Sequence, residues 1–285
     1  MPSGKRRLLA CPACGGELLP DEARSRLSCP SGHRYDAAKQ GYFNLLTGAG
    51  TKFQADTVQM VQARSDFLAA GHYSPLARRL GSLAADAGGQ PVVLDAGAGT
   101  GYYLREVLDA AGGARQAVAL DISKFALRRA ARALPGSYAL VWDVWRPLPL
   151  ADAAVDVVLN VFAPRNPAEF RRVLAPGGML LVVTPLPDHL RQLRSLTGML
   201  DIAGEKETRV ARSLGPGFVP GAAEHLEYSM NLGREDVENA VLMGPSAHHI
   251  EPGALAAALD GAEFPLEVTA AFAVQQFTAA DPAGA

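Results

Sequence analysis

Three glycines at alternate positions follow an acidic residue near the first third of the sequence. Asp95 ends an apolar run of strand length, and Gly97, Gly99 and Gly101 come directly after it. Glycine lets a backbone approach a ligand closely, and the first amides of a helix predicted from Tyr102 onward point into the same gap. The pattern therefore predicts a strand–turn–helix site for a nucleotide-like ligand, although a glycine-rich turn alone does not say which one.

Polar residues also stand at the ends of the next three predicted strands, namely Asp121, Asp143 and Asn160. When strands and helices alternate, the strands form a parallel sheet, and ligands bind beyond their carboxyl ends. A carboxylate after the second strand can accept both hydroxyls of a ribose, and one after the third can accept the exocyclic amine of adenine. Asp is also a common turn residue, but three acids in register favour an adenosine-containing ligand.

The spacing of the glycines separates two classes of adenosine cofactor. Asp-x-Gly-x-Gly-x-Gly resembles motif I of class I S-adenosylmethionine (SAM) methyltransferases, whereas the dinucleotide fingerprint keeps two residues between its second and third glycines. The Pro-Gly-Gly turn at 176–178, before the fifth strand, also favours SAM. Tyr73, at a break between two predicted helices, either covers the cofactor or packs in the core. The residues predicted to bind SAM are Tyr73, Asp95, Gly97, Gly99, Gly101, Tyr102, Asp121, Asp143, Val144 and Asn160.

All three cysteines lie in one short segment near the start of the chain, together with a histidine. Cys11 and Cys14 form a Cys-x2-Cys pair, and Cys29 and His33 form a Cys-x3-His pair after a spacer of 14 residues. Two such turns joined by a hairpin complete a tetrahedral zinc site, and four protein ligands leave no open position. The predicted zinc is therefore structural and supplies folding energy to a segment with few apolar residues. A redox Cys-x-x-Cys pair or incidental cysteines are the rival explanations.

Basic and aromatic residues surround these predicted ligands. The first 80 residues carry 11 Lys+Arg against 6 Asp+Glu, whereas the remainder carries 16 against 23. Basic groups follow phosphates and aromatic rings stack on unpaired bases, so the segment is predicted to bind RNA. An ordinary solvated surface could carry the same charge, and Tyr42 and Phe43 could pack onto the next domain, Phe43 more readily. The residues predicted to bind RNA are Arg24, Arg26, Arg34, Lys39 and Tyr42.

The composition indicates a folded protein that works inside the cell. The 285 residues are 48% hydrophobic and 20% charged, enough for one large core with small appendages. No apolar run reaches the roughly 18 residues that a membrane helix needs, and no apolar region follows the basic start as in a signal peptide. We therefore expect a cytoplasmic protein with no membrane partner.

Hydrophobic periodicity predicts the elements that position these residues. Strands and helices alternate from residue 92 to 184, and further helices and two late strands follow. This order predicts an α/β fold, a Rossmann-like class I SAM-dependent methyltransferase with a mixed sheet of about seven strands. The predicted strands are 92–94, 116–120, 137–142, 155–161, 179–184, 224–232 and 266–277, and the predicted helices are 56–69, 75–87, 102–108, 124–133, 190–200, 234–242 and 253–259.

Three domains are expected along the chain. Residues 1–46 form a zinc-finger or ribbon domain that recognises RNA, 47–90 a linker with two helices, and 91–285 the methyltransferase domain. The stretch 47–53, rich in Gly and Thr, reads as a flexible linker. Asp56 or Thr57 caps the first helix, and Ser123 caps the helix after Asp121.

Longer motifs resemble one family, the RlmA-type methyltransferases, which modify N1 of a guanine in 23S ribosomal RNA. The resemblance spans nearly the whole chain and includes the zinc quartet and the motif I loop. It closely fits the tylosin-resistance branch, RlmA(II), of actinobacteria. The motifs that carry it are Gly-Tyr-Phe-Asn-Leu-Leu at 41–46, Ala-Gly-His-Tyr at 70–73, Asp-Val-Trp at 143–145, Leu-Asn-Val-Phe-Ala-Pro-Arg-Asn-Pro at 159–167, Leu-Val-Val-Thr-Pro at 181–185 and Met-Gly-Pro-Ser at 243–246.

This resemblance implies a function and an assembly. The implied substrate is the 23S rRNA hairpin of domain II that lines the peptide exit tunnel, and the implied consequence is resistance to macrolides of the tylosin type. Family members are homodimers whose zinc domains lie beside an RNA-accommodating cleft. The departures from the family pattern are minor, with small residues between the glycines of motif I.

Methylation of guanine N1 requires that the reacting atoms are positioned in line and that N1 loses its proton. Methyl transfer holds nucleophile, methyl carbon and sulfur in line, and guanine N1 must lose its proton after the base leaves its stack. The residues predicted to be catalytic are Asn160, which hydrogen-bonds the guanine edge, Phe162, which stacks on it, and Pro164 beside them. This proline-bracketed loop could instead be structural. His248 and His249 are candidates for the general base, although an ordinary core or surface role fits either.

Two other functions stay open at the level of sequence. A SAM-dependent methyltransferase of a small molecule, for example in antibiotic biosynthesis, explains the catalytic core but leaves the zinc segment without a purpose. A non-enzymatic RNA-binding protein with a vestigial fold would have no need of Asp95, Asp121 and Asp143.

Overall fold

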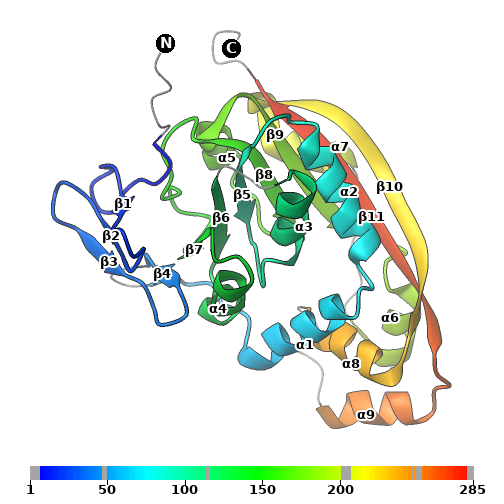
Figure 1. Cartoon of the computed structure of the whole chain (residues 1–285). Helices are drawn as coiled ribbons and strands as arrows, with labels where there is room; N and C mark the ends of the chain where they lie inside the picture. Colours follow the sequence, from blue (N-terminus) through cyan, green and yellow to red (C-terminus); the bar gives the residue numbers. More distant parts are fainter. Residues whose placement is uncertain are drawn as a thin grey trace.

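A mixed sheet of eight strands forms the centre of the molecule (Figure 1). The computed structural model describes residues 7–46, 50–112, 116–199, 207–244, 247 and 252–280. In spatial order the strands are β10 (Phe218–Leu232), β11 (Leu266–Ala279), β9 (Leu174–Pro185), β8 (Val155–Val161), β5 (Val92–Ala96), β6 (Gln116–Asp121), β7 (Tyr138–Val141) and β4 (Tyr42–Asn44).

The sheet is mainly parallel. Each neighbouring pair from β4 to β9 is parallel, whereas β11 runs antiparallel to both of its neighbours, β9 and β10. This is the mixed α/β sheet that the alternating pattern predicts, and it aligns the carboxyl ends of β5, β6, β7 and β8 at one edge. None of the helices within the described ranges is long and apolar enough to span a membrane.

The sheet has one strand more than the expected number of about seven, and the additional strand is β4. Tyr42 lies opposite Ala139 and Asn44 lies opposite Val141, so β4 extends the sheet beyond β7. Three residues are too few to show an alternating pattern. Because β4 belongs to the segment predicted as the zinc-binding domain, that segment contributes directly to the central sheet; the three-domain division of the chain stays a prediction.

Helices cover both faces of the sheet. The apolar core on one face includes side chains from seven helices, and the core on the other face includes side chains from two. The first set is α1 (Val58–Ala69), α2 (Ser74–Ala85), α3 (Tyr102–Ala110), α4 (Lys124–Ala133), α6 (Arg191–Thr197), α8 (Arg234–Leu242) and α9 (Pro252–Asp260), and the second is α5 (Pro167–Val173) and α7 (Glu207–Leu214), which a short 3-10 helix (Gly215–Gly217) follows.

Hydroxyl side chains cap two of the helices that lead to the site. Thr57, and not Asp56, caps α1 and accepts a hydrogen bond from the Met60 amide at 3.2 Å. Ser123 caps α4, as the sequence predicts, and accepts from the Ala126 amide at 3.4 Å. The short helix α5, which the sequence pattern did not reveal, is capped by Asn166.

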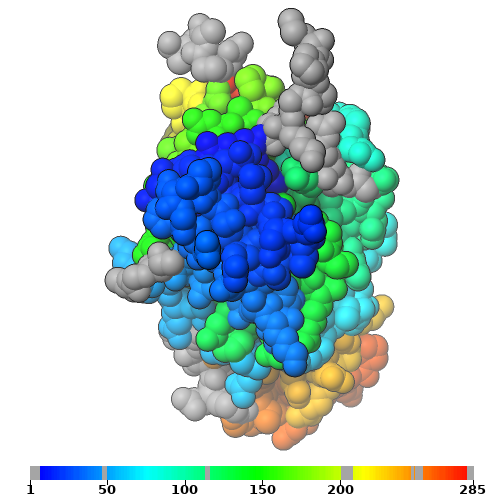
Figure 2. All heavy atoms as spheres, turned by 60° about the vertical axis from the view of Figure 1, so that its left-hand side comes forward, coloured from blue at the N-terminus to red at the C-terminus, as the bar shows by residue number. Residues whose placement is uncertain are grey.

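The N-terminal unit, residues 7–46, packs on the second face of the sheet. Its small antiparallel sheet consists of β1 (Leu19–Pro20), β2 (Arg26–Ser28) and β3 (Arg34–Asp36). Its apolar side chains, among them Leu27 and Phe43, belong to the same buried cluster as strand residues of β5 and β6. In the space-filling view the unit is a lobe against the larger part of the molecule (Figure 2). The unit therefore shares a core with the larger part.

Truncation of Phe43 tests this shared core. The ring is 2% exposed, so Phe43→Ala should lower the free energy of unfolding by about 3–5 kcal/mol, the usual cost of such a cavity. Urea denaturation gives this value. Asn44→Asp, an exposed change on the same strand, is the control, and an unfolding midpoint for Phe43→Ala equal to that of the control would exclude a shared core.

Candidate functional site

The carboxyl group of Asp95 is buried without a hydrogen-bond partner. The residue is 1% exposed, and neither carboxyl oxygen has a partner in the described part of the protein. Burial, with a smaller contribution from the negative charge of Asp121, raises the pKa of Asp95 to about 8. Because an isolated buried charge is costly, the carboxyl group is neutral at pH 7 until a positive group approaches it. An unpartnered acid at this edge fits a cationic ligand.

Asp121 holds the glycine loop against β6. Its Oδ2 accepts a hydrogen bond from the Gly99 amide at 2.8 Å, and its Oδ1 accepts from the Ser123 amide at 2.7 Å. Burial raises the pKa of Asp121, although these two bonds oppose the change. Each carboxylate oxygen keeps a second lone pair, so the predicted contact with ribose hydroxyls is compatible with this arrangement and stays a prediction.

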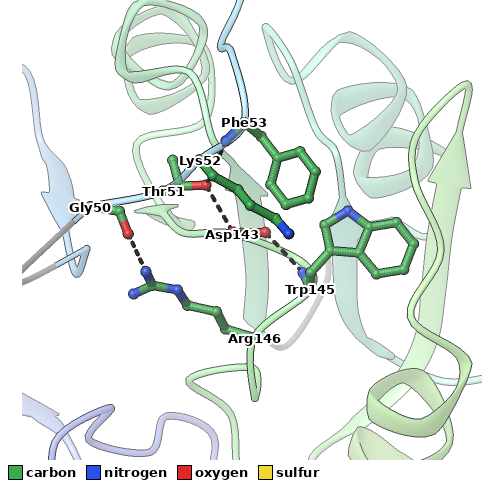
Figure 3. A pocket seen from close by; sticks show the side chains of 7 residues that line it. All are labelled: Gly50, Thr51, Lys52, Phe53, Asp143, Trp145 and Arg146. Atoms are coloured by element: carbon green, nitrogen blue, oxygen red, sulfur yellow. Dashed lines mark hydrogen bonds between the residues drawn. The ribbon is translucent and has the colours of Figure 1, made fainter.

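Asp143 lies at the end of β7 and binds the segment that precedes α1. Thr51 Oγ1 donates to its Oδ2 at 2.8 Å, and the Trp145 amide donates to its Oδ1 at 3.0 Å (Figure 3). Residues 50–53 of the predicted linker are thus anchored to the sheet edge, whereas 47–49 lie outside the described residues. Val144 is half-buried, and its carbonyl accepts from Asn166 Nδ2 at 2.9 Å.

Two glycines of the loop, Gly97 and Gly101, are required by packing against the protein itself. Gly97 has φ +97°, and a Cβ there would lie 2.3 Å from the Ala163 Cβ. Gly101 has φ +81°, and a Cβ there would lie 2.9 Å from Leu134 Cδ1. Gly97 therefore brings the glycine loop against the loop after β8. Whether Gly97, Gly99 and Gly101 also contact SAM stays a prediction.

Asn160 links that second loop to the strand edge. The residue is fully buried, and its Nδ2 donates to the Ala96 carbonyl at 3.2 Å and to the Pro164 carbonyl at 2.9 Å. Its Oδ1 has no partner in the described structure. The amide group is thus committed to the backbone, and only the oxygen remains to accept a hydrogen bond from a ligand.

Phe162 is strained and exposed. Its φ is 53°, a left-handed value that costs free energy in any residue but glycine. The side chain is 43% exposed and lies over buried rings, with centroids 5.5 Å from Phe272 and 6.5 Å from His189. An exposed ring held in a strained position suits a stacking function, which stays a prediction for Phe162.

Tyr73 lies within the same aromatic cluster. It is 2% exposed, and its hydroxyl is 3.0 Å from His189 Nε2. His189 Nδ1 accepts from the Ala271 amide at 3.2 Å, and burial lowers the pKa of His189 to about 3, so the ring is neutral. This is the core position left open for Tyr73 by the sequence, and its contact with SAM stays a prediction. Tyr102, the first residue of α3, is half-buried beside Tyr103.

The four predicted zinc ligands converge in the N-terminal unit. Their ligand atoms all lie within 4.8 Å of one another. Cys14 Sγ is 3.7 Å from Cys29 Sγ, and Cys29 Sγ is 3.4 Å from His33 Nδ1. A tetrahedral zinc with Zn–S bonds of about 2.3 Å places its sulfur ligands about 3.8 Å apart, so Cys11, Cys14, Cys29 and His33 fit a closed structural site.

The predicted RNA-binding residues differ in their freedom to bind. Arg24 donates to the Gly136 carbonyl at 3.1 Å and lies 4.3 Å from the centre of the Tyr138 ring, so it fastens the N-terminal unit to β7. Arg26 pairs with Asp36 at 2.6 Å. Tyr42 is half-buried, while Arg34 and Lys39 are exposed. RNA binding by these five residues stays a prediction.

Two residues near the site were missed from the sequence. Arg64 of α1 donates to Asp56 and, at 2.6 Å, to the Met243 carbonyl, and a Cβ on Gly99 would lie 3.7 Å from its Nη1. Thr51 binds Asp143 as described above. Neither carries a sequence signal, because each owes its role to a contact with a distant segment. His248, His249, Pro245 and Ser246 lie outside the described residues, so the general base stays a prediction.

Comparisons with known proteins agree with both parts of the chain. A family model described as "Methyltransferase domain" matches residues 93–178, and one described as "RlmA, N-terminal" matches residues 9–48. Among solved structures, the YcgJ protein from Bacillus subtilis superposes with a TM-score of 0.51 at 14% identity, covering 71% of this chain and 98% of that chain. The likeness to YcgJ concerns the fold alone.

Two relatives match nearly the full length. A Streptomyces fradiae protein named 23S rRNA (guanine(748)-N(1))-methyltransferase is 46% identical over 253 residues, which is 88% of this chain and 89% of the relative. A Micromonospora griseorubida protein, provisionally named 23S rRNA (guanine-N(1)-)-methyltransferase, is 48% identical over 286 residues, which is 94% of this chain and 96% of the relative. The predicted fold, SAM and structural zinc are therefore confirmed.

The affinity for SAM should depend on pH through Asp95. The carboxyl group must lose its proton to meet the cations of SAM, and its pKa in the free protein is raised to about 8. Affinity should therefore rise as pH increases from 6 to 8, by tenfold or more, and level off above pH 8. Calorimetry across this range measures the change. Asp95→Asn controls for titration of SAM itself, and an equally steep rise in that variant would contradict the assignment.

Loss of one exposed zinc ligand should empty the metal site. Cys14→Ser removes a thiolate that is outside the buried core, so zinc content measured by atomic absorption should fall from about one ion per chain to nearly none. Glu22→Gln, an exposed change on the same segment, is the control. Full zinc content in Cys14→Ser would show that this quartet does not hold the metal.

Proposed function

The chain belongs to the family of 23S rRNA (guanine-N1)-methyltransferases, and we propose that it transfers the methyl group of SAM to N1 of a guanine in 23S rRNA. One observation carries this proposal above all others. The same chain joins an unpartnered buried acid at the carboxyl edge of a methyltransferase sheet to a zinc ribbon that matches the RlmA N-terminal model. A methyltransferase of small molecules would have no use for that ribbon.

The residues of the sheet edge prepare the site before any ligand arrives. Bound SAM supplies an activated methyl group on a positively charged sulfur. Asp95 offers an anion to the cations of the cofactor once it loses its proton, and Asp121 and Asp143 present carboxylate oxygens to its adenosine. Because Asp121 also accepts a hydrogen bond from Gly99, the glycine loop and the carboxylate are already ordered in the free protein. This order reduces the conformational entropy lost when SAM binds.

The loop after β8 is the part of the site that meets the target base. Phe162 exposes its ring there and can stack on a base that has left its helix. Asn160 Oδ1 is a buried acceptor without a partner in the described structure, and it can accept a hydrogen bond from the N1–H or the amine of guanine. Pro164 supports this loop, because its carbonyl accepts from the Asn160 amide.

We extend the proposal to the cellular setting. The Streptomyces fradiae relative is named for guanine 748 of 23S rRNA. We propose the domain II hairpin, which the sequence motifs imply, as the target of this chain, and resistance to tylosin-type macrolides as the outcome. We propose a cytoplasmic location, because a ribosomal substrate is found there. We propose a homodimer in which two N-terminal units flank the RNA, with Arg34 and Lys39 as the exposed basic groups of each unit.

Mapping of the modified nucleotide tests the proposed function. Mass spectrometry of 23S rRNA fragments should show one guanine with an added methyl group in cells that express the protein and none in cells that lack it. Identical spectra from the two strains, together with absent methyl transfer to purified 23S rRNA, would exclude the proposal. Drug susceptibility of the same strains tests resistance.

Phe162→Ala should lower kcat/KM for RNA while the affinity for SAM stays unchanged. Stacking of one base on an aromatic ring is worth about 1–3 kcal/mol, so kcat/KM for RNA should fall roughly 5- to 150-fold. The variant keeps a non-glycine residue at the same strained φ, so backbone strain is unchanged. Phe162→Tyr, which keeps a stacking ring, should restore most of the activity. Unchanged kcat/KM in Phe162→Ala would remove Phe162 from the site.

A further inference from the structure

A hollow of about 670 Å³ lies between residues 50–53 and the loop after β7 (Figure 3). Two aromatic side chains on its wall are exposed, Phe53 at 42% and Trp145 at 50%. Their ring centroids are 6.4 Å apart with an angle of 34° between the planes. Neighbouring exposed apolar rings form a patch of the kind that marks ligand-binding grooves, and the volume is that of a small-ligand site.

The walls of this hollow are fixed by hydrogen bonds. Thr51 binds the Asp143 carboxylate at 2.8 Å, and the Phe53 amide donates to Thr51 Oγ1 at 3.2 Å. Arg146 donates to the Gly50 carbonyl. These bonds join the segment before α1 to the loop after β7, so the backbone positions that carry the two rings are fixed before a ligand binds.

The charge at the hollow is positive. Lys52 Nζ lies 5.4 Å from the centre of the Phe53 ring, and Arg146 also lines the space. Within the described ranges no carboxylate pairs with Lys52. The adenosine end of SAM carries no anion that would attract these cations, whereas every nucleotide of an RNA strand carries a phosphate.

A second hollow continues toward the predicted catalytic loop. It measures about 450 Å³ and is lined by Pro164 and Arg165, and Trp145 belongs to the walls of both hollows. The Asn166 side chain ties the two loops together through the Val144 carbonyl at 2.9 Å. Aromatic and basic groups therefore extend from the segment before α1 to the loop that carries Phe162.

We propose that the Phe53–Trp145 hollow binds one unpaired nucleotide of the RNA substrate, next to the target guanine in the strand. The base lies against the two rings, and Lys52 neutralises its phosphate. The site holds the strand beside the catalytic loop while the guanine enters it. This inference rests on the proposed function for the identity of the RNA, but the hollow itself can be tested by binding alone.

The adenine of SAM is the competing occupant, because Asp143 also lines the hollow. Each oxygen of that carboxylate accepts one hydrogen bond, from Thr51 or from the Trp145 amide, and keeps a second lone pair for the adenine amine. Phe53, Trp145 and Lys52 line the hollow together with Asp143 (Figure 3). The unpaired cation and the connection to the second hollow favour RNA, and the experiment below separates the two occupants.

The two tryptophans provide a direct readout. Trp142 is 6% exposed and Trp145 is 50% exposed, and the chain has no other tryptophan. With SAM at saturation, addition of oligoadenylate, an unpaired RNA, should quench the fluorescence saturably as bases stack on Trp145. Trp145→Phe should keep most of the affinity, measured by anisotropy of labelled oligoadenylate, and lose the quenching.

Two variants test the ring and the charge separately. Phe53→Ala should weaken oligoadenylate binding roughly 5- to 150-fold. Lys52→Gln should reduce the slope of log affinity against log salt by about 0.7, the value for one phosphate contact on a single strand. Both variants should bind SAM within twofold of the wild type and should raise KM for 23S rRNA more than they lower kcat. Arg105→Gln, an exposed charge on α3, should leave both the affinity and the salt slope unchanged.

Two results would overturn the assignment. If Phe53→Ala and Lys52→Gln bind oligoadenylate as the wild type does, no nucleotide lies in the hollow. If SAM alone quenches Trp145 and Phe53→Ala weakens SAM binding, the hollow belongs to the adenine of the cofactor. Failure of the proposed function would look different, since the wild type itself would then methylate no guanine in 23S rRNA.

Discussion

A buried carboxyl group without a partner is the constraint around which the active edge of this sheet is arranged. Asp95 occupies the position where β5 meets the glycine loop, and it is neutral because its surroundings cannot solvate a charge. Ionisation of this carboxyl group destabilises the free protein, and only a bound cation compensates the buried negative charge. The nearby Asn160 Oδ1 is likewise buried and unpartnered. Binding of a positively charged cofactor therefore completes hydrogen bonding and charge that folding leaves incomplete.

The N-terminal unit is joined to this edge by backbone and by apolar packing. β4 extends the parallel sheet, and Phe43 belongs to the core that lies under β5 and β6. The segment after β4 then binds Asp143 through Thr51. The unit and residues 50–53 are therefore both held at the edge of the sheet where Asp143 lies.

The sequence was sufficient to predict helices and strands in which apolar residues recur with a regular period. It was insufficient to predict contacts between distant segments. Apolar periodicity predicted β8 and α8 at their observed bounds. Parallel pairing explains why the acids that end successive strands lie at one edge of the sheet. β4 was missed because a three-residue edge strand has no period of its own. Arg24 is predicted to bind RNA, and its packing on the Tyr138 ring is a contact that the sequence alone does not indicate. The zinc quartet was predictable because cysteine and histidine at this spacing are typical of a structural zinc site.

Infrared difference spectroscopy of the protein with and without SAM addresses the state of Asp95 most directly, because it distinguishes a protonated carboxyl group from a carboxylate. At pH 7, after the bands of SAM itself are subtracted, the addition of SAM should remove one carboxylic-acid band and add one carboxylate band, and neither change should occur in Asp95→Asn. A wild-type spectrum in which Asp95 is already ionised before SAM is added would contradict the proposed basis of cofactor binding.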